Sequence, residues 1–290
     1  MQFTCTKENL ILALNTVVPL TGRGVNLPIL GNVLVVVHES HVELVATNLE
    51  VAVRATLRAK VDSPGSFSVP AKTIADYVSL VSDGQVDITL DGSELLVVCG
   101  ASRTKIKGNP SDEYPVIPSV DEKHGYVLSA EHLRGAIMKT VIASAKNEIR
   151  PELSGVYFGF FTERYNGLVL AATDSYRLAE FQLPVDQGTS EFRCIVPARA
   201  VLEIVRLVSL SASLQKETNI RISLGEGQLM VRYGTFELTT RLIDGKYPDY
   251  AQIIPTSFKT TAVFPVEPMV KLIKAAGIFA ASGVNAVSFD

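Results

Sequence analysis

The sequence predicts an α+β protein in which one domain is repeated along the chain, each copy packing two helices on antiparallel sheets. Two observations support this fold class. The segment ATNLEVAVRA at 46–55 returns as ATDSYRLAEF at 172–181, an offset of 126 residues. The segment VPAKTIADYVSLV at 69–81 returns as VPARAVLEIVRLV at 196–208, an offset of 127 residues. Two long segments that recur at almost one offset indicate a domain that is built twice.

The first copy opens with a short strand and an amphipathic helix. Thr6 is a suitable N-cap, and the apolar residues after it recur at helical spacing until Pro19. Pro70 begins a second helix that carries Ile74 and Val78 on one face. Between these helices we expect strands, at 27–37, 42–46 and 66–69, together with an alternating segment at 50–60.

The first copy ends in a predicted hairpin. Val86–Leu90 and Leu95–Cys99 flank Asp91-Gly92, a dipeptide typical of tight hairpin turns. Arg103–Lys107 then predicts a strand at the edge of a sheet. The second copy repeats this order of elements, which are a helix from Ser129, a group of strands, a helix from Pro197 and a hairpin at 220–232.

A third start follows the second copy. Residues 264–277 carry apolar side chains at helical spacing, and 284–289 resembles the strand that would come next. We therefore expect three parts, at 1–123, 124–256 and 257–290. We expect the last part to be the start of a third domain, about a hundred residues short of a complete copy.

The composition is that of a soluble globular protein, with 47% hydrophobic and 20% charged residues and a net charge of −3. The three cysteines, Cys5, Cys99 and Cys194, form no CxxC pair, which favours a reducing compartment over a disulfide framework. The N-terminal segment shows no small-residue cleavage site typical of a leader, and no apolar run reaches about 18 residues. We expect a cytoplasmic protein.

Charge is distributed unevenly along the chain. The five predicted helical segments carry nine basic and five acidic residues, although the whole chain is acidic. Two interpretations remain open at this point. The helices form a basic surface that faces a polyanion, or they present ordinary solvated charges.

Sequence motifs for catalysis are absent. There is no phosphate-binding GxxxxGK[ST] loop and no GxSxG elbow, and we expect no cofactor. His38 and His41 form too small a cluster for a metal site without further ligands, so we expect no bound metal. Asp174, Arg177, Asp244 and Asp249 could form an acid/base cluster of a hydrolase, but turn aspartates more often cap backbone N–H groups.

Four segments together resemble one family, that of the bacterial sliding clamps, which are the beta subunits of DNA polymerase III. They are LPILGN at 27–32, ATDSYRLA at 172–179, IVPAR at 195–199 and LIDGKYPDY at 242–250. The resemblance implies repeated DNA-clamp domains, three in each chain, and two chains closed head to tail into a ring around duplex DNA. Helices would line the hole and sheets would form the outer wall. The protein would be a non-catalytic processivity factor.

The resemblance also implies site residues. Those expected to touch DNA, without regard to its sequence, are Arg23, Lys72, Lys146, Asn147, Arg150 and Arg199. Those expected in a pocket for short peptides of the replicative polymerase, the clamp loader and repair polymerases are Leu153, Thr173, Ser175, Tyr176, Arg177, Leu178, Pro248, Gln252 and Ile253. Ala198 stands where a basic residue is frequent in the family, which weakens the expected DNA-binding patch. Ser175-Tyr176 and Gln252 also depart from residues that are frequent in the family, so peptide preference could differ.

Ring closure is expected to use an edge strand of the first domain and an apolar pair of the third. The residues are Ser102, Arg103, Lys105 and Ile106, with Ile278 and Phe279. The full-length protein is expected to be a homodimer, and the 290-residue chain to be mainly monomeric. A peptide-binding scaffold without DNA encirclement remains an alternative, as does the less favoured hydrolase.

Overall fold

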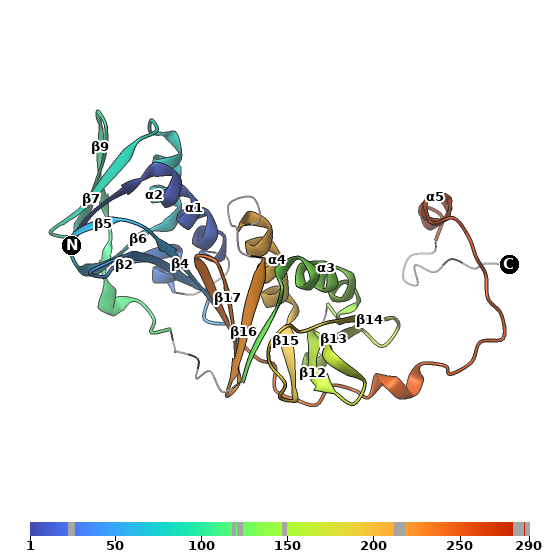
Figure 1. Cartoon of the computed structure of the whole chain (residues 1–290). Coiled ribbons are helices and arrows are strands. Elements are labelled where there is room, and N and C mark those ends of the chain that lie inside the picture. The colour runs from blue at the N-terminus through green and yellow to red at the C-terminus, as the bar shows by residue number, and fades with distance from the viewer. Residues whose placement is uncertain are drawn as a thin grey trace. The chain divides into compact units, whose positions relative to one another are not determined.

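The computed structural model describes residues 1–22, 27–117, 120, 124–146, 150–211, 218–280 and 287. The chain forms two compact units, Met1–Tyr247 and Pro248–Asp290, which we describe separately. The first unit contains the helices and strands of the first two copies of the repeat, and ends nine residues before the boundary expected at 256 (Figure 1).

Four α-helices of the first unit begin where the sequence predicts. They are α1 (Lys7–Val17), α2 (Ala71–Leu80), α3 (Ala130–Thr140) and α4 (Ala198–Ser211). The Thr6 hydroxyl accepts a hydrogen bond from the Asn9 N–H at 3.3 Å, and the Ser129 hydroxyl caps α3 in the same way. Helices α2 and α4 each follow a proline, whose fixed φ suits a helix start.

The strands follow the same order in the two copies. Those of the first copy are β1 (Gln2–Thr6), β2 (Asn32–Val37), β3 (Val42–Thr47), β4 (Val51–Leu57), β5 (Lys60–Ser63), β6 (Gly65–Pro70), β7 (Gln85–Asp91), β8 (Glu94–Cys99), β9 (Ser102–Lys107) and β10 (Asn109–Pro110). Those of the second copy are β11 (His124–Ser129), β12 (Gly155–Thr162), β13 (Tyr165–Thr173), β14 (Leu178–Leu183), β15 (Phe192–Pro197), β16 (Asn219–Gly225), β17 (Gln228–Tyr233) and β18 (Phe236–Arg241). Both predicted hairpins are confirmed.

These strands form three antiparallel sheets. A five-stranded sheet has the order β5-β1-β7-β8-β9, and a four-stranded sheet has the order β14-β13-β12-β15. The third sheet has nine strands, in the order β10-β6-β2-β3-β4-β18-β17-β16-β11, and both copies contribute to it. Strand β4 of the first copy pairs with β18 of the second, so the backbone ladder crosses the domain boundary.

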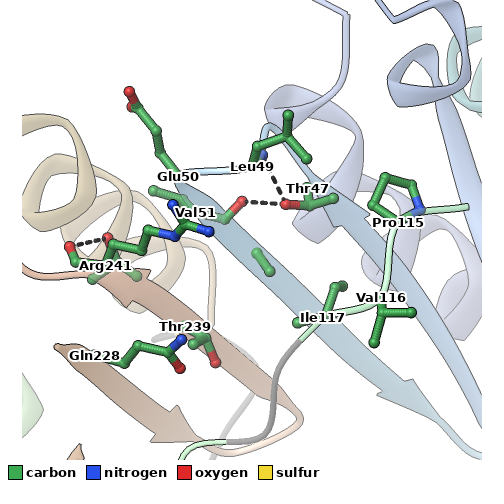
Figure 2. Close-up of a pocket in the computed structure, with 12 residues that line it drawn as sticks. Thr47, Leu49, Glu50, Val51, Pro115, Val116, Ile117, Gln228, Thr239 and Arg241 are labelled. Atoms are coloured by element: carbon green, nitrogen blue, oxygen red, sulfur yellow. Dashed lines mark hydrogen bonds between the residues drawn. The ribbon is translucent and has the colours of Figure 1, made fainter. Parts of the chain in front are cut away.

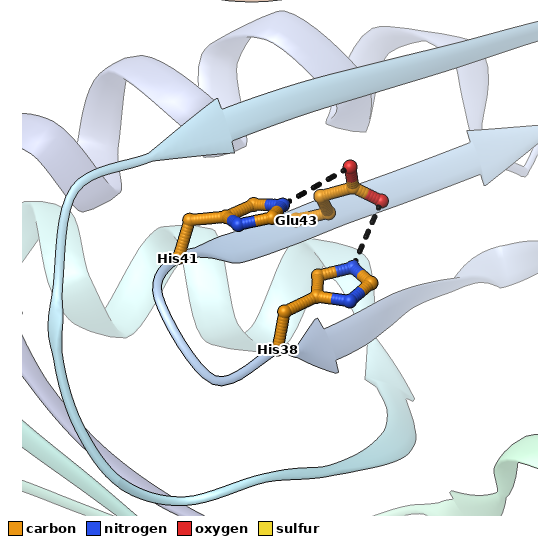
Figure 3. A group of neighbouring side chains, drawn as sticks. All are labelled: His38, His41 and Glu43. Atoms are coloured by element: carbon orange, nitrogen blue, oxygen red, sulfur yellow. Dashed lines mark ion pairs between the residues drawn. The ribbon is translucent and has the colours of Figure 1, made fainter.

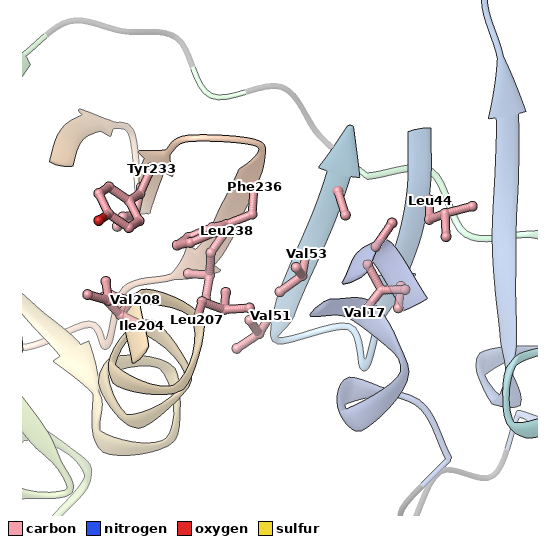
Figure 4. Close-up of a cluster of buried hydrophobic side chains, with 14 of the residues drawn as sticks. Val17, Leu44, Val51, Val53, Ile204, Leu207, Val208, Tyr233, Phe236 and Leu238 are labelled. Carbon is pink, nitrogen blue, oxygen red and sulfur yellow. The ribbon is translucent and has the colours of Figure 1, made fainter. Parts of the chain in front are cut away.

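The helices cover the inner faces of these sheets and share one core. Helix α1 packs on β3 and β4, whereas α3 and α4 pack on β12–β15, as Figure 1 shows. Figure 4 shows Val51 and Val53 of β4 near Leu207 of α4 and Leu238 of β18. All four side chains are at most 4% exposed and belong to one buried cluster, so the apolar core continues beneath the β4–β18 pair.

Two expectations about local structure are wrong. Residues 28–31 form a 3₁₀ turn, η2 (Pro28–Gly31), where a strand was predicted. Pro28 lacks the N–H that a ladder needs, and the Leu30 N–H bonds the Leu27 carbonyl instead. The helix predicted from Ser129 was expected to extend over 129–146, but α3 gives way to the 3₁₀ turn η4 (Val141–Ala143), so Lys146 lies beyond the helix. The β-branched run from Thr140 to Ile142 disfavours further α-helix.

Four further 3₁₀ turns complete the regular structure. They are η1 (Val18–Leu20), η3 (Ser111–Glu113), η5 (Pro151–Leu153) and η6 (Tyr250–Ile253). The second unit holds η6 and α5 (Val266–Gly277), the helix that the sequence predicts at 264–277. The strand predicted at 284–289 falls almost wholly outside the described residues. None of the helices in the described part of the chain is long and apolar enough to cross a membrane.

The three cysteines are free and buried. Burial, together with the nearby carboxylate of Asp87, raises the pKa of the Cys5 thiol to about 12. Burial also raises the pKa of Cys194. Because a thiol reacts through its thiolate, these two cysteines are structural side chains of the core.

Candidate functional site

The repeated segment at 172–181 contains the tight turn between β13 and β14. The Thr173 hydroxyl donates to the Arg177 carbonyl at 2.7 Å and accepts from the Ser175 N–H at 3.1 Å. Asp174 Oδ1 accepts from the N–H groups of Tyr176 and Arg177, each at 3.0 Å. Ser175 has φ +76°, a left-handed conformation that a non-glycine residue rarely adopts. The turn is therefore held in one conformation by its own side chains.

Asp174 acts in this turn as a capping residue. Although its partial burial acts to raise the pKa, backbone N–H groups and the Arg177 guanidinium, 3.0 Å away, lower the pKa of Asp174 below its ordinary value. Asp249 in the second unit likewise caps η6 by accepting from the Ala251 N–H. These bonds match the capping interpretation of the aspartates and not an acid/base pair.

The first copy forms the same turn between β3 and β4. The Thr47 hydroxyl donates to the Val51 carbonyl at 2.9 Å and accepts from the Leu49 N–H at 3.0 Å. Asn48 takes the place of Asp174 and accepts from the Val51 N–H at 2.8 Å. Leu49 has φ +76°, as Ser175 does. The repeat that the sequence predicts therefore extends to individual hydrogen bonds.

A tyrosine fixes the end of the strand before each turn. The Tyr247 hydroxyl accepts a hydrogen bond from the Thr173 N–H at 3.0 Å, and the Tyr114 hydroxyl accepts one from the Thr47 N–H. Tyr114 also donates to the Asn32 carbonyl at 3.3 Å. Burial raises the pKa of both tyrosines to about 12, opposed in part by the bonds from the backbone N–H groups of Thr47 and Thr173. Both hydroxyls therefore stay protonated and structural at neutral pH.

The residues predicted to bind peptides differ in exposure. Leu153 and Thr173 are buried, whereas Ser175 and Arg177 are exposed and Tyr176 is 98% exposed. Leu178 is half-buried at the start of β14. The other three residues lie in the second unit and are Pro248, Gln252 and Ile253. In that unit, Gln252 Nε2 donates to Asp249 Oδ2 at 2.9 Å.

A pocket of about 280 Å³ opens where the two copies meet in the first unit (Figure 2). It is lined by the turn at 47–52 and by the segment 115–117. Strands β17 and β18 also line it, through Gln228, Thr239, Thr240 and Arg241. By the internal repeat, 47–52 corresponds to 173–178. Sequence reasoning missed Gln228 and Arg241, because only the long-range pairing of β4 with β18 brings them here.

The residues predicted to touch DNA are exposed where the structure describes them. Lys72 and Arg199 occupy equivalent positions in the first turns of α2 and α4. Neither forms an ion pair with another described residue, nor does Lys146. Arg150 Nε lies 3.0 Å from Glu152 Oε1. The two remaining predicted residues, Arg23 and Asn147, lie outside the described residues.

Other basic helix residues have structural partners. The Lys7 ammonium, on a side chain only 12% exposed, contacts Asp83 at 3.0 Å and the Val81 carbonyl at 2.5 Å. The Arg206 guanidinium of α4 donates to the carbonyls of Asn15 and Thr16, at 3.0 and 2.5 Å. Arg206 therefore ties the second copy to the last turn of α1 in the first copy.

The predicted ring-closing residues also differ in their surroundings. Strand β9 is the last strand of the five-stranded sheet, and its Ser102, Arg103 and Lys105 are exposed. Ile106 is 5% exposed and packs in the core of its own copy. Lys105 pairs with Asp91 at 2.7 Å. In the second unit, the predicted apolar pair is exposed by 77% and 87%; it consists of Ile278 and Phe279.

Comparisons with known protein families agree with this geometry. Residues 1–118 match the N-terminal domain of the DNA polymerase III beta subunit, and residues 127–249 match its central domain. The beta sliding clamp of Pseudomonas putida is 32% identical over 259 residues, which is 88% of this chain and 68% of that protein. The chain belongs to the bacterial beta sliding clamp family. Members of this family are non-catalytic processivity factors of DNA polymerase III, which excludes the hydrolase alternative.

Other sliding clamps extend the comparison. The protein of Escherichia coli K12 is 30% identical over 258 residues, covering 88% of this chain and 68% of that protein. The protein of Synechococcus elongatus is 28% identical over 296 residues, covering 99% and 76%. The crystal structure of the Pseudomonas aeruginosa clamp bound to griselimycin superposes with a TM-score of 0.88 at 28% identity, over 98% of this chain and 76% of that one.

Proposed function

We propose that this chain acts within a ring that encircles duplex DNA and tethers polymerases to it. The observation that carries this proposal is the β4–β18 pair. Five residue pairs, from Phe236↔Ala55 to Thr240↔Val51, join the end of one copy to the sheet of the other. Each copy of the repeat can therefore pair with a neighbouring copy through these two strands.

The strands equivalent to this pair have open edges. By the order of elements in the repeat, β9 corresponds to β18 and β14 corresponds to β4. In the sheets of the first unit, β9 pairs only with β8, and β14 only with β13. An exposed edge offers unpaired N–H and C=O groups to another strand. The same head-to-tail pairing repeated at both edges would generate a closed ring.

The positions of the unpaired basic residues support DNA in the middle of that ring. Lys72 and Arg199 lie at equivalent helix starts, so each copy would offer a similar contact to the phosphate backbone. Contacts of this kind carry no sequence information, and they are weak enough to let a ring slide.

We further propose that the 173–178 turn of the second copy takes part in binding short peptides. Tyr176 and Arg177 project from a turn whose backbone is already fixed, so that backbone loses little conformational entropy when a peptide binds. In Leu178→Ala, we expect the affinity for a polymerase-derived peptide to fall by about 1–3 kcal/mol. Leu202→Ala, which removes an exposed leucine of α4, is the matched control. Unchanged affinity in Leu178→Ala would remove that residue from the site.

The decisive experiment concerns encirclement. The full-length protein is loaded with clamp loader and ATP onto nicked circular DNA, and its retention is measured before and after the circle is cut. A ring is retained on the circle and slides off the linear form. Equal retention on both would contradict the ring and favour the peptide-binding scaffold. The variant Lys72→Ala/Arg199→Ala should load less efficiently but still be lost on cutting.

A further inference from the structure

Two histidines and one glutamate meet at the hairpin between β2 and β3. His38 directly follows β2, His41 directly precedes β3, and Glu43 is the second residue of β3. All three project from one face of the sheet (Figure 3). This is the face opposite to α1, because the alternate residues Val42 and Leu44 are buried in the core. Within the described residues, no other place brings three such groups together.

The hairpin holds the two rings in place. The His38 N–H donates to the His41 carbonyl at 2.9 Å, which closes a turn of two residues. The two imidazoles stack with ring centroids 4.4 Å apart and planes inclined by 18°. Ser40 Oγ lies 3.1 Å from His41 Nδ1, and this contact turns the other ring nitrogen toward Glu43. A hydrogen bond on the far nitrogen is the usual support of a metal-binding histidine.

The spacing of the donor atoms suits a metal ion. His38 Nε2 lies 3.4 Å from Glu43 Oε2, and His41 Nε2 lies 3.5 Å from Glu43 Oε1. Two ligand atoms on one tetrahedral ion, each bonded at about 2.1 Å, are separated by about 3.4 Å. All three groups offer a ligand atom within 4.8 Å of the others. His38 Nε2 is buried without a hydrogen-bond partner, although its ring is partly exposed.

We propose that His38, His41 and Glu43 bind one divalent transition-metal ion of the zinc class. Two imidazoles and one carboxylate select Zn²⁺, Co²⁺ or Ni²⁺ over Mg²⁺ and Ca²⁺, which prefer sets of oxygen ligands. Three protein ligands leave a fourth position for water or for a side chain of a partner. The site lies outside the regions assigned to DNA and peptides, so this proposal goes beyond the clamp function.

A neighbouring arginine makes a specific prediction about affinity. Arg54 Nη1 lies 3.7 Å from Glu43 Oε2, and its Nε lies 3.7 Å from Glu237 Oε1. The guanidinium therefore opposes a cation at Glu43 and competes for its carboxylate. Arg232 holds Glu237 at 2.8 Å independently of Arg54. The uncharged variant Arg54→Gln should bind the metal more tightly than the natural chain.

The test uses Co²⁺ as a spectroscopic probe and Zn²⁺ as its competitor. The 290-residue chain is freed of metal with a chelator and titrated with Co²⁺. We expect one equivalent to bind with the intense visible absorption of tetrahedral coordination, and Zn²⁺ to bleach it. His38→Ala, His41→Ala and Glu43→Gln should each weaken binding about tenfold or more, whereas His132→Ala, on an exposed histidine of α3, should not.

Three results would overturn the proposal. They are binding without saturation at one equivalent, a His38→Ala variant that keeps its affinity, and an Arg54→Gln variant that binds more weakly than the natural chain. Circular dichroism of each variant checks folding, and Glu43→Gln keeps the size of the side chain if an alanine variant fails to fold. The sequence did not predict this site, because the third ligand lies beyond the histidine pair on a strand.

Discussion

At the scale of the residue, each copy has one buried tyrosine hydroxyl that holds the end of the strand before its turn. Tyr247 is 8% exposed and accepts the N–H of Thr173, which is itself 6% exposed and ends β13. The Tyr157 ring packs against the Tyr247 ring in a tilted arrangement, with ring centroids 5.3 Å apart. A phenylalanine would keep that ring contact but leave the Thr173 N–H without this acceptor.

We therefore expect Tyr247→Phe to lower the free energy of unfolding by about 1–3 kcal/mol, the cost of a buried donor that loses its partner. Urea denaturation followed by circular dichroism measures this change. Tyr114→Phe should have a similar effect, because Tyr114 accepts the N–H of Thr47 in the first copy. Tyr176→Phe is the control and should leave stability unchanged, since that side chain is 98% exposed. Equal stability of Tyr247→Phe and the control would contradict the structural role of the hydroxyl.

Residues that act through their neighbours along the chain were predictable from sequence. Thr6 and Ser129 cap helices, and Asp174 caps a turn, because each bonds an N–H group two or three residues away. The positions of the proposed ligand Glu43 and of the pocket residue Arg241 were not predictable in this way. Their surroundings depend on strand register, although the alternation of side chains along a strand could have placed Glu43 on the face of His41.

At the scale of the element, the helix starts and the hairpins follow from local chemistry, but the junction between copies does not. Pro70 and Pro197 fix helix starts, and Gly92 supplies the positive φ of a hairpin turn. No local pattern indicates that β4 pairs with β18, since those strands are separated by most of two domains. The 3₁₀ turn at Pro28–Gly31 was missed because its apolar composition resembles that of a buried strand.

Arg206 provides a test of that junction. Its guanidinium donates to two carbonyls in the last turn of α1, where a cation is favoured by the helix dipole, and also pairs with Glu203. We expect Arg206→Met to lower the free energy of unfolding by about 1–3 kcal/mol. It should also increase amide hydrogen exchange in β4 and β18, which meet at the same boundary.

The control for this test is Arg134→Met. Arg134 pairs with Glu131 on the same helix and has no role at the junction, so its loss should cost only about 0.3 kcal/mol. If both variants lost the same small amount of stability, the contacts of Arg206 with α1 would be no more than a surface ion pair.

At the scale of the whole molecule, the net charge does not show where the exposed basic residues lie. The chain carries −3, yet Lys72 and Arg199 are exposed at equivalent helix starts without ion pairs among the described residues. Two other basic helix residues, Lys7 and Arg206, instead contact protein partners. A count of the charges on the helices could not distinguish basic residues without ion pairs from those that contact protein partners.

The salt dependence of DNA binding distinguishes a phosphate contact from an ordinary surface charge. Each phosphate contact releases condensed counterions, so its loss should reduce the slope of log affinity against log salt by about one unit. We expect Arg199→Ala to weaken binding to duplex DNA of any sequence and to reduce the slope by this amount. Arg193→Ala is the matched control, because Arg193 lies on β15 and pairs with Glu163 and Glu191. If the slope of Arg199→Ala equalled that of the control, Arg199 would be a solvated charge, and the proposed contacts with DNA would have to be sought on other residues.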